Sequence, residues 1–194
     1  MVIGPRGLSI EDDARIRLAL ATAQNSTHAT FELAVVQASD HYALFPVAWG
    51  ALGTVAVTGT LALVRPELRI GAAFVFELGL LVVATLALDW WPIRLAIVPS
   101  AAKRNAASRM AHHEFAVRIV GNSHERNGVM LFVSLGERYV EILADQAVHA
   151  RVPQESWERI VSEFTDAMKA NRYADGLVAA IQAIGEILAA ALPH

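Results

Sequence analysis

Two long apolar stretches in the middle of the chain constrain its fold more than any other feature. The first is ALFPVAWGALGTVAVTGTLALV over residues 43–64, and the second is IGAAFVFELGLLVVATLAL over residues 70–88. Each has about the 20 residues that a helix needs to cross the hydrocarbon layer of a membrane. Only the segment 65–69 separates them, so the pair predicts a membrane-spanning helical hairpin.

A pair of buried soluble helices is the alternative interpretation of these stretches. A soluble helix of this length normally shows a polar face. The first stretch has no charged residue, and its threonine hydroxyls can bond to carbonyl groups of their own helix. The sequence therefore favours the membrane.

Glu77 is the one charged residue in the second stretch. A charge near the bilayer centre costs about 2.5–3.5 kcal/mol, whereas the eleven Leu, Ile, Val and Phe of the stretch return about 3–6 kcal/mol. The segment can insert, with Glu77 expected to face the other helix or another subunit, protonated or hydrogen-bonded. Glu77 is either an intramembrane ion or proton site or a polar residue that fixes helix packing.

Composition excludes several classes of function. A net charge of −3 and a pI near 6.1 give no basic field for nucleic acid. The chain has no cysteine, which excludes disulfides, thiol chemistry and cysteine-ligated metal centres. Outside the hairpin about 140 residues remain, enough for one ordinary core.

The flanks of the hairpin alternate between helical and strand patterns. Ser9 and Asp12 form a variant capping box that begins a helix running to Gln24. The pattern predicts further helices over 100–120, 154–171 and 177–192, with Asp175-Gly176 separating the second of these from the third. It predicts strands over 30–37, 129–135 and 138–144, and the second and third strands are expected to form a hairpin. In the third strand, Tyr139, Glu141 and Leu143 are expected on one face and Val140, Ile142 and Ala144 on the other.

The final helical segment is apolar enough to raise the question of a third membrane span. Gln182 and Glu186 lie opposite its stripe of leucine and isoleucine, so a packed amphipathic helix is preferred.

The first strand is too short to form a sheet alone, and the later strands need a partner. We therefore expect one α/β domain built from both flanks: residues 1–40, then a transmembrane hairpin over 41–92, then the rest of the domain over 93–194.

The basic residues near the two spans indicate the orientation of the hairpin. Four follow the second span, namely Arg94, Lys103, Arg104 and Arg109, whereas only Arg65 and Arg69 lie between the spans. No secretory signal is visible, so the hairpin itself is expected to direct the chain to the membrane. The positive-inside rule then predicts a bacterial inner (plasma) membrane protein with a cytoplasmic α/β domain.

The flanks resemble the TPM domain family, named for a thylakoid lumen protein, a photosystem II repair protein and a worm receptor modulator. The resemblance rests on TFELAVV and ASDHY, on ERNGVMLFVSLGERYVEILAD with its Gly128-Val129, Ser134-Leu135 and Glu137-Arg138 pairs, and on WERIV and YADGLVAAIQAIGEIL. It implies a Rossmann-like α/β sandwich with a small mixed sheet flanked by helices. Some members are linked to phosphatase activity, calcium binding or assistance to membrane complexes. Many carry a signal peptide and a C-terminal anchor, whereas here the membrane part lies inside the domain.

Metal binding or acid–base catalysis would need carboxylates or imidazoles that converge on one site. The candidates are Glu32, Asp40 and Asp145, with His41 and His149, because α/β sheets usually place ligands at strand ends. Asp40 and Asp145 are the candidate catalytic residues, and with Glu32 they form a candidate metal site. Calcium is the ion that the family resemblance implies for it. The alternative is that these acids cap turns and helices.

Three functional hypotheses follow from these patterns and from what the family resemblance implies. The leading one is a membrane-anchored interaction or accessory module for a membrane complex, in contact with the lipid bilayer and with a membrane protein or a second copy of the chain. The second is a calcium-dependent, phosphatase-like hydrolase that uses Asp40, Asp145 and Glu32. The third is an intramembrane ion or proton site at Glu77.

Overall fold

The computed structural model describes residues 9–64, 70–121 and 126–193, and it divides into two compact units. The first unit comprises residues 1–39 and 104–194, and the second comprises residues 40–103. The predicted connection at 65–69 lies outside the described residues. The chain is an α/β protein, as the sequence predicts.

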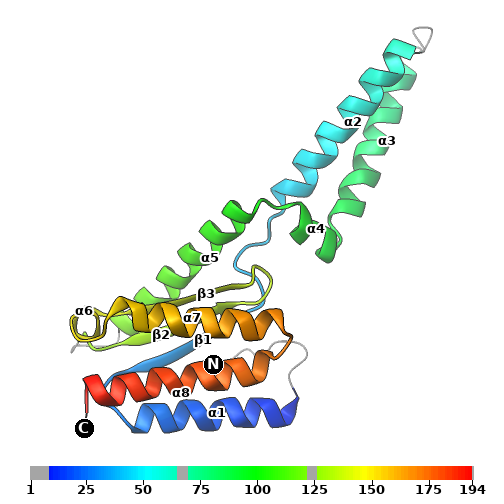
Figure 1. Cartoon of the computed structure of the whole chain (residues 1–194). Helices are drawn as coiled ribbons and strands as arrows, with labels where there is room; N and C mark the ends of the chain where they lie inside the picture. The colour runs from blue at the N-terminus through cyan, green and yellow to red at the C-terminus, as the bar shows by residue number, and fades with distance from the viewer. Residues whose placement is uncertain (1–8, 65–69, 122–125, 194) are drawn as a thin grey trace. The chain divides into compact units, whose positions relative to one another are not determined.

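A three-stranded mixed sheet forms the centre of the first unit (Figure 1). Its strands are β1 (Phe31–Val36), β2 (Val129–Ser134) and β3 (Tyr139–Ala144), in the order β1-β2-β3. β1 runs parallel to β2, and β3 runs antiparallel to β2. The predicted hairpin of the last two strands is confirmed.

One face of this sheet packs against three helices, which are α1 (Ile10–Asn25), α7 (Gln154–Lys169) and α8 (Tyr173–Ala191). Phe31, Leu131 and Val140 point to this side from the three strands. The alternation predicted for β3 is confirmed, since Val140, Ile142 and Ala144 join this core while Tyr139 and Leu143 join the core on the other face.

The opposite face packs against α5 (Ser100–Phe115) and the π-helix η1 (Ala116–Val120) that continues it. Ala107 and Ala111 of α5 are fully buried there beside Phe132 of β2. The predicted helix over 100–120 is therefore confirmed, with a wider turn over its last five residues. Helices on both faces of the sheet form the sandwich that the sequence predicts.

The capping box predicted for α1 is present. The Ser9 hydroxyl accepts a hydrogen bond from the N–H of Asp12 over 3.0 Å, and the Asp12 carboxylate accepts one from the N–H of Ser9 over 3.4 Å. The two bonds satisfy N–H groups that a helix start otherwise leaves unpaired.

The boundary between the last two helices is not where the sequence predicts it. α7 ends at Lys169 and α8 begins at Tyr173, so Asp175 and Gly176 lie in the first turn of α8 rather than between the helices. The chain turns at Asn171, whose φ of +56° lies in the left-handed region that asparagine tolerates. The apolar stripe of α8 is buried as predicted, and Gln182 and Glu186 are exposed.

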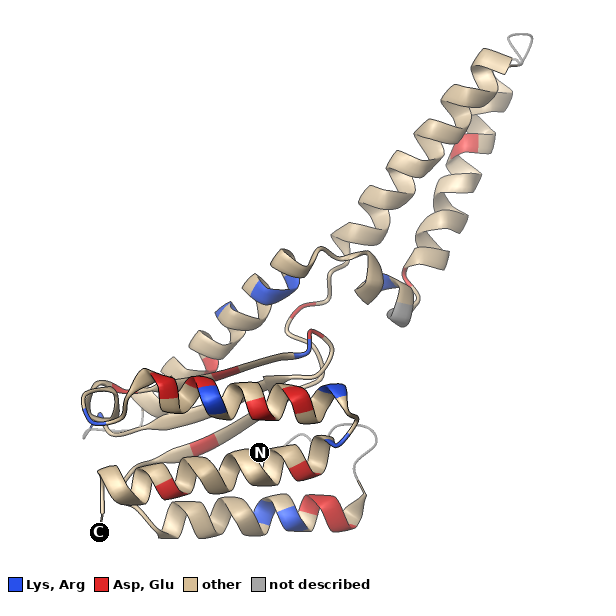
Figure 2. Cartoon of the chain, viewed as in Figure 1, with Lys and Arg blue, Asp and Glu red and all other residues tan. Residues whose placement is uncertain are grey.

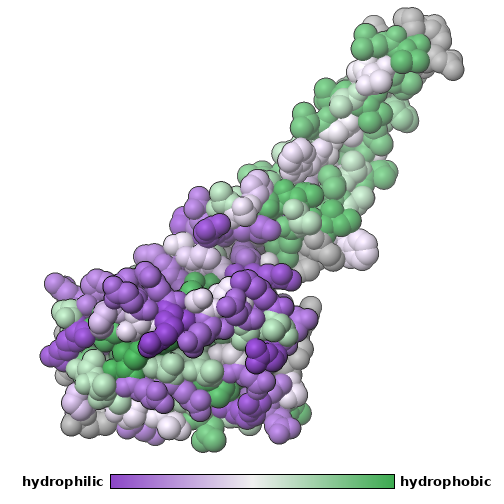
Figure 3. Space-filling view, viewed as in Figure 1, coloured by the Kyte–Doolittle hydropathy of each residue, from purple (hydrophilic) through white to green (hydrophobic). Residues whose placement is uncertain are grey.

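The second unit contains α2 (Leu44–Val64), α3 (Ile70–Leu88), the short α4 (Trp91–Ile97) and the first four residues of α5. Three helices of the described chain are long and apolar enough to cross a membrane, namely Leu44–Val64, Gly71–Leu88 and Tyr173–Ala191. The third of these is α8, whose stripe belongs to the core of the first unit. Figure 3 shows the apolar surface of α2 and α3 and the largely hydrophilic surface of the first unit.

Candidate functional site

A hydrogen-bonded polar cluster lies at the carboxyl ends of the parallel strands β1 and β2. It consists of Ser39, Ser134 and Glu137, and we call it the Ser–Glu cluster. The Ser134 hydroxyl donates to the Glu137 carboxylate. The Ser39 hydroxyl donates to Ser134 Oγ over 3.0 Å, and the Ser39 N–H donates to Glu137 Oε1 over 2.9 Å. Open α/β sheets usually bind ligands at this edge.

The Ser–Glu cluster fastens the turn between β2 and β3 to the end of β1. Two backbone bonds continue it: Leu135 N–H donates to the Val36 carbonyl over 3.1 Å, and Gly136 N–H donates to the Gln37 carbonyl over 2.8 Å. Ser134 is fully buried. A nucleophilic serine must reach its substrate, so the burial of Ser134 assigns it a structural role.

Asp40 follows the Ser–Glu cluster in the chain and belongs to the second unit. Its side chain is exposed, and its carboxylate accepts hydrogen bonds from the N–H groups of His41 over 2.6 Å and Tyr42 over 3.4 Å. This is the local turn geometry in which aspartate bonds to its own backbone. Tyr42, the residue that ends the turn, has a φ of +50°.

Glu32 and Asp145 lie at the other end of the sheet, where β1 begins and β3 ends. Glu32 pairs in register with Met130, and Asp145 follows Ala144, which pairs with Val129. Asp145 caps α6 (Gln146–His149), accepting a bond from the Gln146 N–H over 2.7 Å. β1 and β3 are separated by β2, so their backbones lie about 10 Å apart.

The topology spaces Glu32, Asp40 and Asp145 widely along the sheet, and a site that they share stays a prediction. Asp40 follows the carboxyl end of β1, whereas Asp145 sits beside its amino end, and a six-residue strand is about 20 Å long. Within residues 9–64, 70–121 and 126–193, no three His, Asp or Glu side chains group closely enough to hold a metal ion. His149 ends α6, and His41 stays beside Asp40.

Glu77 lies on the stripe of α3 that is least exposed, together with Ala73, Leu81 and Thr85. This stripe faces α2, because a methyl group built on Gly50 of α2 would lie 3.1 Å from Thr85 Oγ1 and 3.7 Å from Leu81. A position facing the other helix agrees with the sequence-based expectation.

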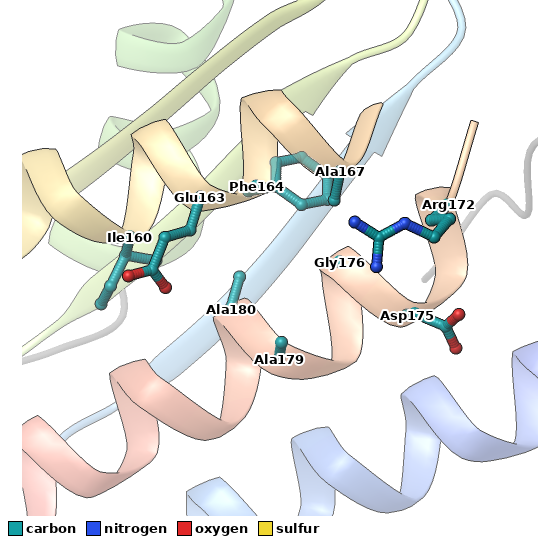
Figure 4. Close-up of a pocket in the computed structure, with 9 residues that line it drawn as sticks. All are labelled: Ile160, Glu163, Phe164, Ala167, Arg172, Asp175, Gly176, Ala179 and Ala180. Carbon is teal, nitrogen blue, oxygen red and sulfur yellow. The ribbon is translucent and has the colours of Figure 1, made fainter. Parts of the chain in front are cut away.

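A cavity of about 290 Å³ opens between α7 and α8 (Figure 4). Phe164, Ala167 and Gly176 give it an apolar floor, and Glu163 and Arg172 carry charges at its two ends. The nearby Asp175 carboxylate is paired with Arg15 of α1 over 2.8 Å. The cavity has an apolar lining with separated charges, which does not assemble a catalytic group.

Burial raises the pKa of two tyrosines in the first unit. For Tyr173 burial is the whole cause, and its hydroxyl has no hydrogen-bond partner within the described part of the chain. For Tyr139 burial is the largest cause; a hydrogen bond with Ser108 lowers the pKa, and one with Glu141, at 2.9 Å, raises it. Burial thus favours the neutral form of both phenols.

The sequence profile of one domain family, the TPM domain, matches residues 90–187. The chain belongs to the TPM domain family. The match includes β2, β3, α5 and α7, and hence the Ser134–Glu137 part of the Ser–Glu cluster. The resemblance stated from the sequence is confirmed.

A solved structure supports the fold of this TPM domain protein. The NMR structure of the BA42 protein from the psychrophilic bacterium Bizionia argentinensis is similar to it, with a TM-score of 0.57 and 14% sequence identity. The alignment covers 96% of this chain and 85% of BA42. At this identity the likeness concerns the fold alone. A search of curated proteins gave no significant match.

The Ser–Glu cluster was only partly visible in the sequence of the TPM domain. The family resemblance includes both VSLGE and the ASDHY segment that contains Ser39, but the sequence does not link Ser39 to Ser134, because the two lie 95 residues apart. The one available signal was that both segments follow apolar strands, whose carboxyl ends meet when the strands are parallel.

Proposed function

We propose that this TPM domain protein is anchored in a membrane by its helical hairpin and serves as an interaction or accessory module for a membrane complex. The observation that carries the proposal is how α2 and α3 pack. Their contact uses small residues, since Gly50 and Thr54 are buried and Thr85 adjoins Gly50. Large apolar side chains point outward, among them Val75, Val83 and Leu86, which are 65–70% exposed.

This arrangement is the reverse of a soluble helical pair. In water, leaving a Val or Leu side chain exposed forgoes about 1.5–3 kcal/mol relative to burial, and α3 has no buried residue in its 18-residue apolar window. Helices in lipid commonly pack through small residues and present large ones to the acyl chains. A bilayer around α2 and α3 accounts for both observations.

The proposed topology places both ends of the hairpin, and with them the α/β domain, on the cytoplasmic side of the plasma membrane. Arg94, Lys103, Arg104 and Arg109 follow α3 closely in the chain. Basic residues near the end of a span are retained on the cytoplasmic side.

An interaction role is favoured over hydrolysis because the candidate carboxylates are dispersed. Asp40 and Asp145 follow opposite ends of the sheet, and each is engaged with backbone N–H groups. Acid–base or metal-assisted hydrolysis needs such groups on one substrate. The remaining features are a folded domain and a helical hairpin that anchors it in the membrane.

Alkaline extraction of cell membranes tests the anchor. The full chain should stay in the membrane pellet, and Val75→Lys with Val83→Lys should move it to the soluble or aggregated fraction, because two charges at exposed positions of α3 oppose insertion. The matched control is Ile10→Lys with Leu18→Lys, which changes two exposed apolar residues of α1 and should leave the pellet unchanged. Release of the unmodified chain by alkali would refute the anchor.

Chemical cross-linking in membranes, followed by affinity capture, tests the accessory role. The full chain and Asp40→Asn with Asp145→Asn should capture the same membrane complex, because the role does not depend on those carboxylates. A chain with an unrelated hairpin-anchored domain serves as the control. Identical captures by the control would contradict the accessory role while leaving the anchor intact.

A further inference from the structure

The solvent-facing side of α5 carries cationic and neutral side chains. Arg104 and Arg109 are exposed there, with His112 and His113 farther along the helix. The single acidic residue of α5, Glu114, is only partly exposed and is paired with Arg118. We call the exposed surface around Arg104, Asn105, Arg109 and His112 the α5 basic face.

The helices on the other side of the sheet have the opposite charge. α7 and α8 together contain six acidic residues and two basic ones. Figure 2 shows the basic residues along α5 and the acidic ones along α7 and α8. The sheet lies between these helix layers, so the domain is electrically polarised across its thickness although the whole chain has a net charge of only −3.

We propose that the α5 basic face is a binding surface for anionic lipid headgroups and holds the domain against the membrane in one orientation. This inference rests on the proposed membrane anchor. Two observations select lipid as the occupant. The charge of the face complements an anionic bilayer, and the chain limits its distance from the bilayer, since α3 ends at Leu88 and α5 begins at Ser100.

The same polarity opposes the reverse orientation. A domain turned over would bring the acidic α7 and α8 toward anionic lipid, which repels like charge. Each Lys or Arg close to an anionic surface strengthens docking about fivefold. Dissolved salt limits the range of this attraction to about 10 Å. Arg104 and Arg109 together should therefore strengthen docking about 25-fold.

The absence of cysteine from the chain permits a clean test. Asn105→Cys places a fluorescent label in the middle of the α5 basic face, at an exposed position. The full chain is reconstituted in nanodiscs of phosphatidylcholine, with or without phosphatidylglycerol, that contain a headgroup-attached quencher. We expect quenching with phosphatidylglycerol, little without it, and its loss in high salt or in Arg104→Gln with Arg109→Gln.

Matched variants separate docking from general charge effects. Arg159→Gln with Lys169→Gln removes two exposed cations from α7 and should leave the quenching unchanged. A label at Gln182→Cys, on the exposed side of α8, should stay unquenched in either lipid.

A label at Val83→Cys, with an acyl-chain quencher, reports on the anchor itself. If this label is not quenched, the proposed anchor fails and the inference fails with it. If it is quenched while the Asn105 label is indifferent to phosphatidylglycerol, the inference alone is overturned. If the label at position 105 is already shielded from solvent in detergent without lipid, a second copy of the chain covers the α5 basic face. That result also overturns the inference.

Discussion

Ser134, the last residue of β2, donates its hydroxyl hydrogen to the carboxylate of Glu137 three residues later, inside the turn that leads to β3. Because Ser134 is fully buried and also accepts from Ser39, the pair joins three segments at one edge of the sheet. Their bonds have measurable consequences for stability.

Replacement of Ser134 by alanine should lower the free energy of unfolding by about 1–3 kcal/mol, since it removes a donor from a carboxylate that is not fully solvated. Denaturant titration of the full chain in detergent measures the change. Ser162→Ala, at an exposed position of α7, is the control and should be neutral or slightly stabilising. Equal free energies of unfolding for the two variants would show that the Ser–Glu cluster does not contribute to stability.

Gly176→Ala should destabilise the packing of α7 on α8. The added methyl would lie 2.5 Å from Ala167 Cβ and 3.2 Å from the Phe164 ring, and such overpacking costs about 1–3 kcal/mol. The paired exchange Gly176→Ala with Ala167→Gly restores the volume and should recover part of the loss. Gly79→Ala, which meets nothing within 4 Å, should have little effect on thermal unfolding of the domain.

Tyr173→Phe should preserve or raise stability, because it removes a buried hydroxyl that has no partner in the described part of the chain while keeping the edge-to-face contact with Phe164.

The Tyr173→Phe variant should also lose less stability than the unmodified chain at alkaline pH. Burial raises the pKa of Tyr173 above its ordinary value near 10, so its contribution is complete below pH 10 and declines at higher pH. Unfolding titrations at pH 8 and pH 11 compare the variants; an unchanged alkaline loss would contradict this assignment.

Asp40→Asn and Asp145→Asn should have additive effects on thermal unfolding, with and without calcium. The two carboxylates follow opposite ends of the sheet and accept hydrogen bonds from different backbone N–H groups, and distant substitutions add to within about 0.5 kcal/mol. Calorimetry of the single and double variants gives the coupling. A large coupling energy that appears only with calcium would restore the shared metal site.

Sequence patterns predicted those parts of the fold that burial alone determines. The alternation along β3 and the stripe of α8 were correct, because each follows from which side chains leave water. The turn at Asn171 was missed, since Asp175-Gly176 is the stronger turn signal by residue type. Glycine serves there instead as the small residue that lets α8 approach Ala167.

The candidate site was harder to predict because it depends on strand direction. A sequence shows that Asp40 and Asp145 each follow a strand, but not that β3 runs antiparallel to β2 and so ends beside the start of β1. That reversal separates the carboxylates. The proposed division at residues 40 and 92 and the calcium site stay predictions.

The parallel pairing of β1 with β2 also sets an order of events during synthesis. Phe31 pairs with Val129, so the first strand leaves the ribosome long before its partner exists, and the whole apolar hairpin is made in the interval. The sheet can close only after the whole hairpin has been synthesised. If the hairpin inserts as proposed, folding of the domain follows delivery of the nascent chain to the membrane.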